Sequence, residues 1–280
     1  MTATTQDLII SRLRTPSIPA MVVRLNALLD DPDVCIEEIA RAIRDDPSIS
    51  AMVLRTVNSA RYGLREPVRN IERAAMVLGI REIQKIVLQV AVVQQFDHLP
   101  SSPVFDMSEL WKHSILTGLV AQDLARVARI PLPVAREDLY TCGLLHDIGK
   151  VILFDNFGEH YLEVMVESRN TGRSLWQCEV DSYNFSHPAI GGVVALQWAL
   201  PAEVEAAIAH HHGPTDRIAP VGVVAITCLA DVIANAVQAG ETPPGDLMKD
   251  RRFRSLAGIK PDQLEQVIES AVESLAGIDV

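Results

Sequence analysis

The sequence is poor in aromatic residues and shows no strongly alternating pattern of apolar and polar residues. Aromatic side chains make up 5% of the 280 residues, and aliphatic side chains supply most of the 48% that are hydrophobic. This composition disfavours a β-sandwich and favours close packing of helix on helix. A chain of this length can bury one large core or form two packed helical lobes.

Cysteines are also few, and no Cys-x-x-Cys pair is present. The four residues Cys35, Cys142, Cys178 and Cys228 are scattered, and three lie in apolar helical stretches, which is typical of small core side chains. Reduced thiols in a cytoplasm are therefore expected, rather than disulfides or a zinc knuckle. The N-terminal MTATTQDLII lacks a basic region followed by an apolar run, so no signal peptide is indicated.

Positive charge is in deficit, because 25 Lys and Arg residues face 36 Asp and Glu residues, for a net charge of -11. This field repels phosphate backbones and argues against non-specific nucleic-acid binding. Residues 51–90 are an exception, because basic residues are in excess there. An acidic partner or a nucleotide could bind to them, although a solvated helix face is the favoured interpretation. They hold Arg55, Arg61, Arg65, Arg69, Arg73, Arg81 and Lys85 against Glu66, Glu72 and Glu82.

One apolar stretch, residues 218–240, is nearly long enough to span a bilayer. Asp231 is its only charged residue, but it also contains Pro220, Thr227 and Asn235, and no basic cluster flanks it. We therefore expect a buried central helix and no association with a membrane.

Caps followed by apolar residues at three- and four-residue spacing predict the first helices. Ser17, Asp33 and Asp46 each precede such a run, with Pro47 at the first helical position after Asp46 and Gly63 closing the third helix. The polar segment 97–107 is the best candidate for a lobe boundary. Further helices are expected at about 83–96, from Ser108 to about 124, and at 136–148, 156–169, 174–184, 188–199, 201–212, 220–239 and 262–276.

Residues with metal-ligand chemistry recur through the second half of the chain. They are His113, His146, Asp147, His187, His211, His212 and Asp231. Imidazole nitrogens and carboxylate oxygens together suit Fe, Mn, Zn, Ni or Co, and adjacent pairs can reach one site from one element. We expect these side chains to converge.

Asp231 is the most informative of them, because it is the lone charge between Arg217 and Glu241. An isolated carboxylate there would face a desolvation cost of several kcal/mol. A bound metal would supply the compensating cation. A protonated acid, a contact with the backbone or an arginine partner would serve equally well, and the residue alone does not choose between them.

The histidines have ordinary explanations as well. His146 and Asp147 are expected to end a helix that Gly149 terminates. His113 lies one turn after Glu109 and could form an ion pair with it. His187 precedes a proline and could cap a helix, whereas the run 210–212 could interact favourably with a helix dipole.

The run Leu144–Lys150 (LLHDIGK) resembles the central motif of the HD superfamily of metal-dependent phosphohydrolases. Other pieces follow that family's order: WKHS at 111–114, HPAIG at 187–191, AIAHHH at 207–212 and AD at 230–231. The HDOD branch in particular is similar at PSIP (16–19), DPSI (46–49), NSA (58–60), LG (78–79) and LQWALP (196–201). The resemblance covers about residues 13–235.

This resemblance implies an all-α fold, namely an HD-domain-like helical bundle with an N-terminal helical lobe. Residues 1–100 would form that lobe, and residues 101–240 would form the HD-like lobe with the metal site. Residues 241–280 would form a C-terminal helical extension, to which the resemblance assigns no role. The seven candidate ligands would bind divalent metal, and we expect two ions of Fe, Mn, Zn or Ni. Asp147 would bridge these two ions. If the protein is an enzyme, the resemblance implies that Asp147 and Lys150 are its catalytic residues. Asp147 would hold both ions, and Lys150 would offset the negative charge that develops on the phosphoryl oxygens.

Two functions follow from the family. HDOD domains are regarded as bacterial signalling output modules, many of which have lost the ligands and work by contact with a partner protein. This chain keeps a full ligand set, so a phosphohydrolase acting on a nucleotide or phosphodiester is the alternative. After His212 it reads GPTDR at 213–217, without the Gly-Tyr-Pro element of cyclic-di-GMP phosphodiesterases. We favour a regulatory module with a signalling protein as its partner.

Overall fold

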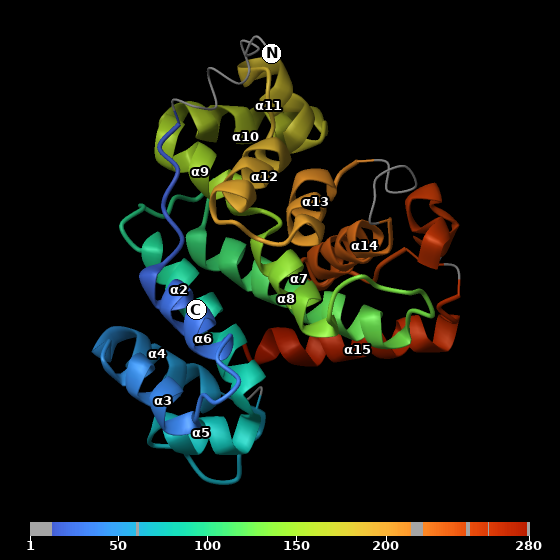
Figure 1. The fold of residues 1–280 in the computed structure, drawn as a ribbon. Coiled ribbons are helices and arrows are strands. Elements are labelled where there is room, and N and C mark those ends of the chain that lie inside the picture. Colours follow the sequence, from blue (N-terminus) through green and yellow to red (C-terminus); the bar gives the residue numbers. More distant parts are fainter. Residues whose placement is uncertain (1–12, 60–61, 214–220, 245–246, 257, 279–280) are drawn as a thin grey trace. The chain divides into compact units, whose positions relative to one another are not determined.

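The computed structural model describes residues 13–59, 62–213, 221–244, 247–256 and 258–278, and these contain helices and no β-strand (Figure 1). The predicted all-α fold is thus confirmed. Contacts divide the chain into two units, of residues 18–98 with 273–280 and residues 1–17 with 99–272. Several residues named from the sequence lie outside the described ones: 1–10, Ala60, Arg61, 214–217 and Pro220.

The smaller unit is built from five helices around an aliphatic core that includes Leu25, Ile39, Val53 and Val87. They are α2 (Ala20–Leu29), α3 (Ile36–Arg44), α4 (Pro47–Val57), α5 (Ile71–Leu78) and α6 (Ile80–Gln95). The Asp46 carboxylate accepts hydrogen bonds from the backbone of α4, as predicted.

Two of the predicted caps in this unit are wrong. The residue that precedes α2 is Pro19 rather than Ser17, and the one that precedes α3 is Cys35 rather than Asp33. The helix α5, capped by Asn70, was not predicted, because only the following apolar stripe was recognised. Gly79, at φ 85°, separates it from α6, and this left-handed backbone favours glycine.

The larger unit carries all the candidate ligands. Its helices are α7 (Met107–Val127), α8 (Arg136–Leu145), α9 (Ile148–Phe157), α10 (Glu159–Thr171), α11 (Leu175–Tyr183), α12 (His187–Gln197), α13 (Ala202–His210) and α14 (Val221–Gln238). Short 3-10 turns at Leu247–Lys249 and Arg251–Leu256 precede α15 (Pro261–Ala276). Asp106 caps α7 by accepting from the backbone N–H of Ser108, so the helix begins at Met107, one residue before the expected Ser108.

Glycines allow the helices that carry ligands to approach closely. A Cβ at Gly143 in α8 would lie 2.5 Å from the Gly118 Cα in α7, so the two backbones touch. Gly149 was expected to end a helix but lies within α9, where a Cβ would overlap the carbonyl oxygen of His187. The preceding helix ends earlier, at Leu145, and α9 has already begun at Ile148.

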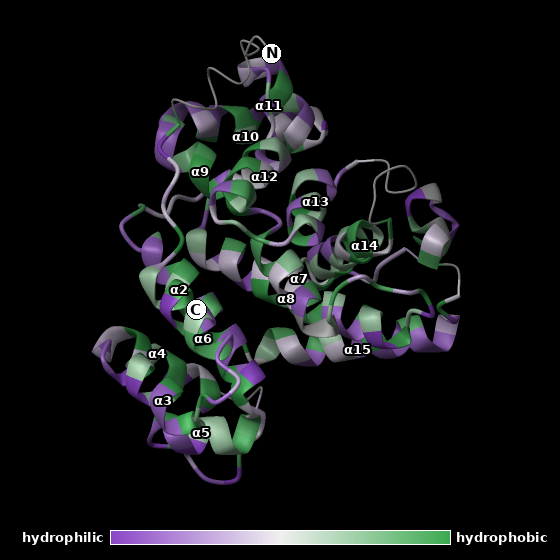
Figure 2. Cartoon of the chain, viewed as in Figure 1, coloured by the Kyte–Doolittle hydropathy of each residue, from purple (hydrophilic) through white to green (hydrophobic). Residues whose placement is uncertain are grey.

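The apolar helix α14 is long enough to cross a membrane by length and composition, with a mean hydropathy of 1.8 (Figure 2). However, 67% of that stretch is buried inside the molecule, including Asp231 and Thr227. It therefore has the burial of a core helix, as expected. The four cysteines are free thiols, and all but Cys35 are buried.

Candidate metal centre

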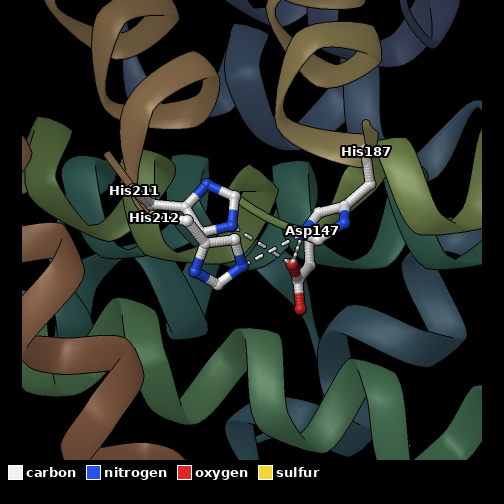
Figure 3. A group of neighbouring side chains, drawn as sticks. All are labelled: Asp147, His187, His211 and His212. Carbon is white, nitrogen blue, oxygen red and sulfur yellow. Dashed lines mark hydrogen bonds and ion pairs between the residues drawn. The ribbon is translucent and has the colours of Figure 1, made fainter. Parts of the chain in front are cut away.

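The seven candidate ligands come from five places in the larger unit and gather in two groups. The first group is His113 from α7, His146 from the end of α8 and Asp231 from α14. The second is Asp147, His187 at the start of α12, and His211 with His212 at the end of α13 (Figure 3). Within each group the ligating atoms lie within 4.8 Å of one another.

Asp147 lies between the two groups and turns one oxygen toward each. Its Oδ2 is 3.3 Å from the Nε2 of His146 and 3.9 Å from that of His113. Its Oδ1 is 3.4 Å from the Nε2 of His187 and 3.5 Å from that of His211. Each oxygen of this carboxylate could therefore serve a different cation, if ions were bound in both groups. Figure 3 shows three of the histidine rings around the carboxylate.

Two imidazoles are oriented by backbone carbonyls on the side away from the centre. The Nδ1 of His146 lies 2.7 Å from the carbonyl of Gly143, and that of His211 lies 2.8 Å from the carbonyl of Ile208. A carbonyl only accepts, so each Nδ1 carries a proton and Nε2 is the atom turned toward the other candidate ligands. Metal-bound histidines are held in this way in most metalloproteins.

Some buried polar atoms in the centre have no hydrogen-bond partner among the described residues. They include the Oδ1 of Asp147, the Nε2 of His211 and the Nδ1 of His113. An unsatisfied buried acceptor costs about 1–3 kcal/mol, and the two facing Asp147 and His211 atoms are too far apart for a good hydrogen bond. A cation between them would satisfy both. The donor set therefore fits divalent metal ions.

Electrostatics hold both carboxylates ionised. Burial raises the pKa of Asp147, but the charges of His146 and Lys150 outweigh burial and leave that pKa well below its usual value. The pKa of Asp231 is likewise depressed, because contacts with His113 and His146 outweigh burial. Burial alone would lower the pKa of His146, yet the two carboxylates raise it to about 10. His146 thus balances charge when no cation is present.

His211 and His212 behave in the opposite way. Burial lowers the pKa of His211 to about 4 and also lowers the pKa of His212, helped by the neighbouring rings. Neutral imidazoles are the form that binds metal. His212 adds a further contact, its Nε2 lying 3.1 Å from that of His187.

Neighbouring residues bear on two of the alternatives that the sequence left open. Asp231 lies against a histidine and an asparagine, since its Oδ1 is 3.1 Å from the Nε2 of His113 and accepts from Asn235 at 2.6 Å. The two oxygens of Glu109 accept from Lys112 at 2.7 Å and from Gln238 at 2.9 Å, whereas the carboxylates near His113 are those of Asp231 and Asp147. Lys150 donates to the Oδ2 of Asp147 at 2.5 Å.

Sequence reasoning missed Glu179, a fully buried residue of α11. Its Oε2 accepts from both the Nδ1 and the backbone N–H of His187, at 2.7 and 2.8 Å. Its Oε1 accepts from the hydroxyl of Tyr161 at 2.7 Å. The signal that could have found it is the one used for Asp231, a carboxylate beside apolar neighbours in a helix, here Cys178 and Val180.

Comparison with known proteins places these observations in a family. The family model of the HDOD domain matches residues 15–214. An HDOD domain protein of unknown function from Geobacter sulfurreducens has a similar structure, with a TM-score of 0.80 and 25% identity over 97% of this chain and 95% of that one.

Two further structures share the fold at lower identity. One is a Shewanella amazonensis protein whose name proposes a phosphohydrolase, with a TM-score of 0.73 and 20% identity over 98% of each chain. The other is a Marinobacter aquaeolei protein whose name proposes signal transduction, with a TM-score of 0.69 and 19% identity over 99% of this chain and 62% of that one. An uncharacterized protein of Treponema pallidum is 26% identical to this chain over 200 residues. The matched region covers 70% of this chain but only 37% of the length of that relative.

Proposed function

The chain belongs to the HDOD family, and from this premise we propose that it is a regulatory signalling module organised around a centre of two divalent metal ions. The family match and the likeness to a protein named for signal transduction support the regulatory role. We further propose a signalling protein as the partner.

The observation that carries the metal centre is the position of Asp147 between two groups of ligands. His113, His146 and Asp231 would hold one ion, His187, His211 and His212 the other, and Asp147 both. Sets of imidazole and carboxylate ligands suit Fe, Mn, Zn or Ni. Ions held between α7, α8, α12, α13 and α14 would stabilise the folded state by mass action, because the unfolded chain has no such site.

Burial favours a regulatory role for the ions over a catalytic one. His146, Asp147, His187 and His211 are at most 1% exposed. Lys150 would have to offset charge on a phosphate, but its ammonium is engaged by Asp147 and only 20% of its side chain is exposed. Among the described residues, these four side chains leave little exposed surface for a bulky phosphodiester, whereas His212 is partly exposed.

A phosphohydrolase is the second candidate, and the complete ligand set together with Lys150 favours it. When bound, two divalent ions would supply Lewis acidity and lower the pKa of a water molecule toward about 7. In that case Asp147 would position both ions and Lys150 would stabilise negative charge on phosphoryl oxygens. The substrate would be a nucleotide or another phosphodiester.

A hydrolysis assay separates the two candidates. Protein loaded separately with Fe²⁺, Mn²⁺, Zn²⁺ or Ni²⁺ is incubated with bis(p-nitrophenyl) phosphate and with cyclic nucleotides. The regulatory role predicts no release of product above the buffer rate with any metal. Metal-dependent turnover that Asp147→Ala abolishes, and that the surface variant His160→Gln retains, would contradict it and establish the enzyme.

A further inference from the structure

The Glu179 carboxylate joins three helices of the larger unit beside the metal centre. Glu179 lies in α11, receives the hydroxyl of Tyr161 from α10, and receives two donors of His187 at the first turn of α12. Both oxygens are therefore used, one for α10 and the other for α12. Neither Glu179 nor His187 has any exposed surface.

These bonds fix the His187 ring in two ways. Because the carboxylate accepts from Nδ1, the proton stays on that nitrogen and Nε2 is left toward the Oδ1 of Asp147. Because the same oxygen accepts from the His187 backbone N–H, the ring and the start of α12 cannot move independently. A negative charge next to Nδ1–H also makes Nε2 a stronger donor to a cation.

Besides these hydrogen bonds, the hairpin formed by α10 and α11 meets the elements around the centre where α10 packs on α9 and α11 on α12. The helix α11 packs mainly against α10 and meets α12 over a short contact. Asn184 leaves α11 in a left-handed conformation, and His187 follows only three residues later. Among the described residues, the hydrogen bonds of Glu179 thus join both helices of this hairpin to His187.

We propose that Glu179 is a positioning residue that couples metal occupancy at His187 to the order of the α10–α11 hairpin. This inference rests on the proposed metal centre and adds a route by which its occupancy reaches the surface. Coupling between two sites is reciprocal. A cation at His187 would hold Glu179 and the hairpin in place, and a loosened hairpin would weaken binding of the cation.

Three variants test this coupling in the full chain. Glu179→Gln keeps the size of the side chain but removes its charge, and Tyr161→Phe removes only the bond to α10. Tyr183→Phe is the matched control, because it deletes another buried tyrosine hydroxyl in the hairpin, one that has no hydrogen-bond partner among the described residues. Mn²⁺ and Zn²⁺ affinities are measured by competition with a chelator, and hydrogen exchange is followed over residues 159–183.

In the wild-type protein, metal should slow exchange in both helices. Glu179→Gln should weaken binding on the order of 10- to 100-fold, the usual effect of losing a carboxylate behind a metal-bound histidine, and should remove most of the metal-induced protection. Tyr161→Phe should weaken binding less and lose the protection mainly in α10. Tyr183→Phe should match the wild type in both measurements.

The outcomes distinguish this inference from the metal centre itself. If the wild type takes up neither metal, the proposed centre is wrong and the coupling falls with it. If the wild type binds metal, but Glu179→Gln binds within twofold of it and shows the same gain in protection, the centre stands and the coupling is wrong. Should Glu179→Gln fail to fold, Tyr161→Phe decides the question, because unchanged protection of α10 in that variant would equally contradict the coupling.

Discussion

In the metal-free centre, the negative charges of two carboxylates are nearly balanced by the positive charges of a lysine and a histidine. Asp147 and Asp231 stay ionised, Lys150 is cationic, and His146 retains its proton because its pKa is raised to about 10. His146 must lose that proton before its Nε2 can bind a cation, so metal binding and proton release are linked. His211, in contrast, is already neutral at pH 7.

This difference predicts how the stability of the metal-free protein depends on pH. A histidine whose pKa falls to about 4 on folding stabilises the protein above its unfolded pKa of about 6.5, and that contribution is lost as the pH falls through this range. The raised pKa of His146 acts in the opposite sense, but most of its effect lies between pH 6.5 and 10. His212, whose pKa is also lowered by burial, acts in the same sense as His211, so urea unfolding in a chelator should show a loss on the order of 2 kcal/mol for each of these two histidines between pH 7 and pH 5.

His211→Gln should reduce that loss, because it removes the buried group that must take up a proton. His160→Gln is the control, since His160 is 59% exposed and pairs with Glu163 at the surface. An equal loss of stability in all three proteins would show that His211 does not titrate as described.

Sequence reasoning worked for residues whose chemistry conflicts with their surroundings. Asp231 was selected because it is the lone charge of an apolar helix, and it lies 3.1 Å from a ligating nitrogen of His113. Glu179 was missed, although the same conflict exists, because other polar residues share its helix. The signal is weaker in α11 because only the immediate neighbours of Glu179, Cys178 and Val180, are apolar.

Among the elements, the break between α8 and α9 matters most for the centre. Gly149 was interpreted as a helix stop because glycine is common there, but its role is to let α9 meet the start of α12. Asp147 occupies the break with φ -98° and ψ 8°, outside both helices. Local preferences cannot reveal such a glycine, because the neighbour that needs the space is 38 residues away in the sequence (149 to 187).

Gly149→Ala should therefore destabilise the protein. The added Cβ meets the His187 backbone rather than a flexible side chain, so relief requires α9 and α12 to separate, which typically costs about 1–3 kcal/mol. Separation also moves Asp147 away from His187, so metal affinity should fall. Urea unfolding and competition with a chelator measure the two effects.

Gly258→Ala provides the matched control, because its new Cβ would lie 3.9 Å from the nearest atom, the Cβ of Arg129. It should change neither stability nor metal affinity appreciably. If Gly149→Ala were as stable as Gly258→Ala and bound metal equally well, the close approach of α9 and α12 would not be what positions the centre.

Across the whole molecule, composition and periodicity were enough to predict the fold class but not the convergence of the ligands. The all-helical architecture follows from the aliphatic composition and helical spacing, and it is confirmed. The ligands lie between positions 113 and 231, on five helices or helix ends, and no spacing rule brings them together. Residue chemistry selected them as candidates and the resemblance to the HD pattern gave them a common role, and their binding of metal remains a prediction.

Metal stoichiometry is the sharpest test of the two-ion centre. Purified protein is saturated with Mn²⁺ or Zn²⁺, freed of loose metal by gel filtration and examined by elemental analysis, alongside Asp147→Ala and the surface control His160→Gln. We predict two equivalents per chain in the wild type and the control, and a loss of both or nearly both in Asp147→Ala, since its carboxylate serves both ions. One equivalent or none in the wild type, or two in Asp147→Ala, would contradict the shared two-ion centre.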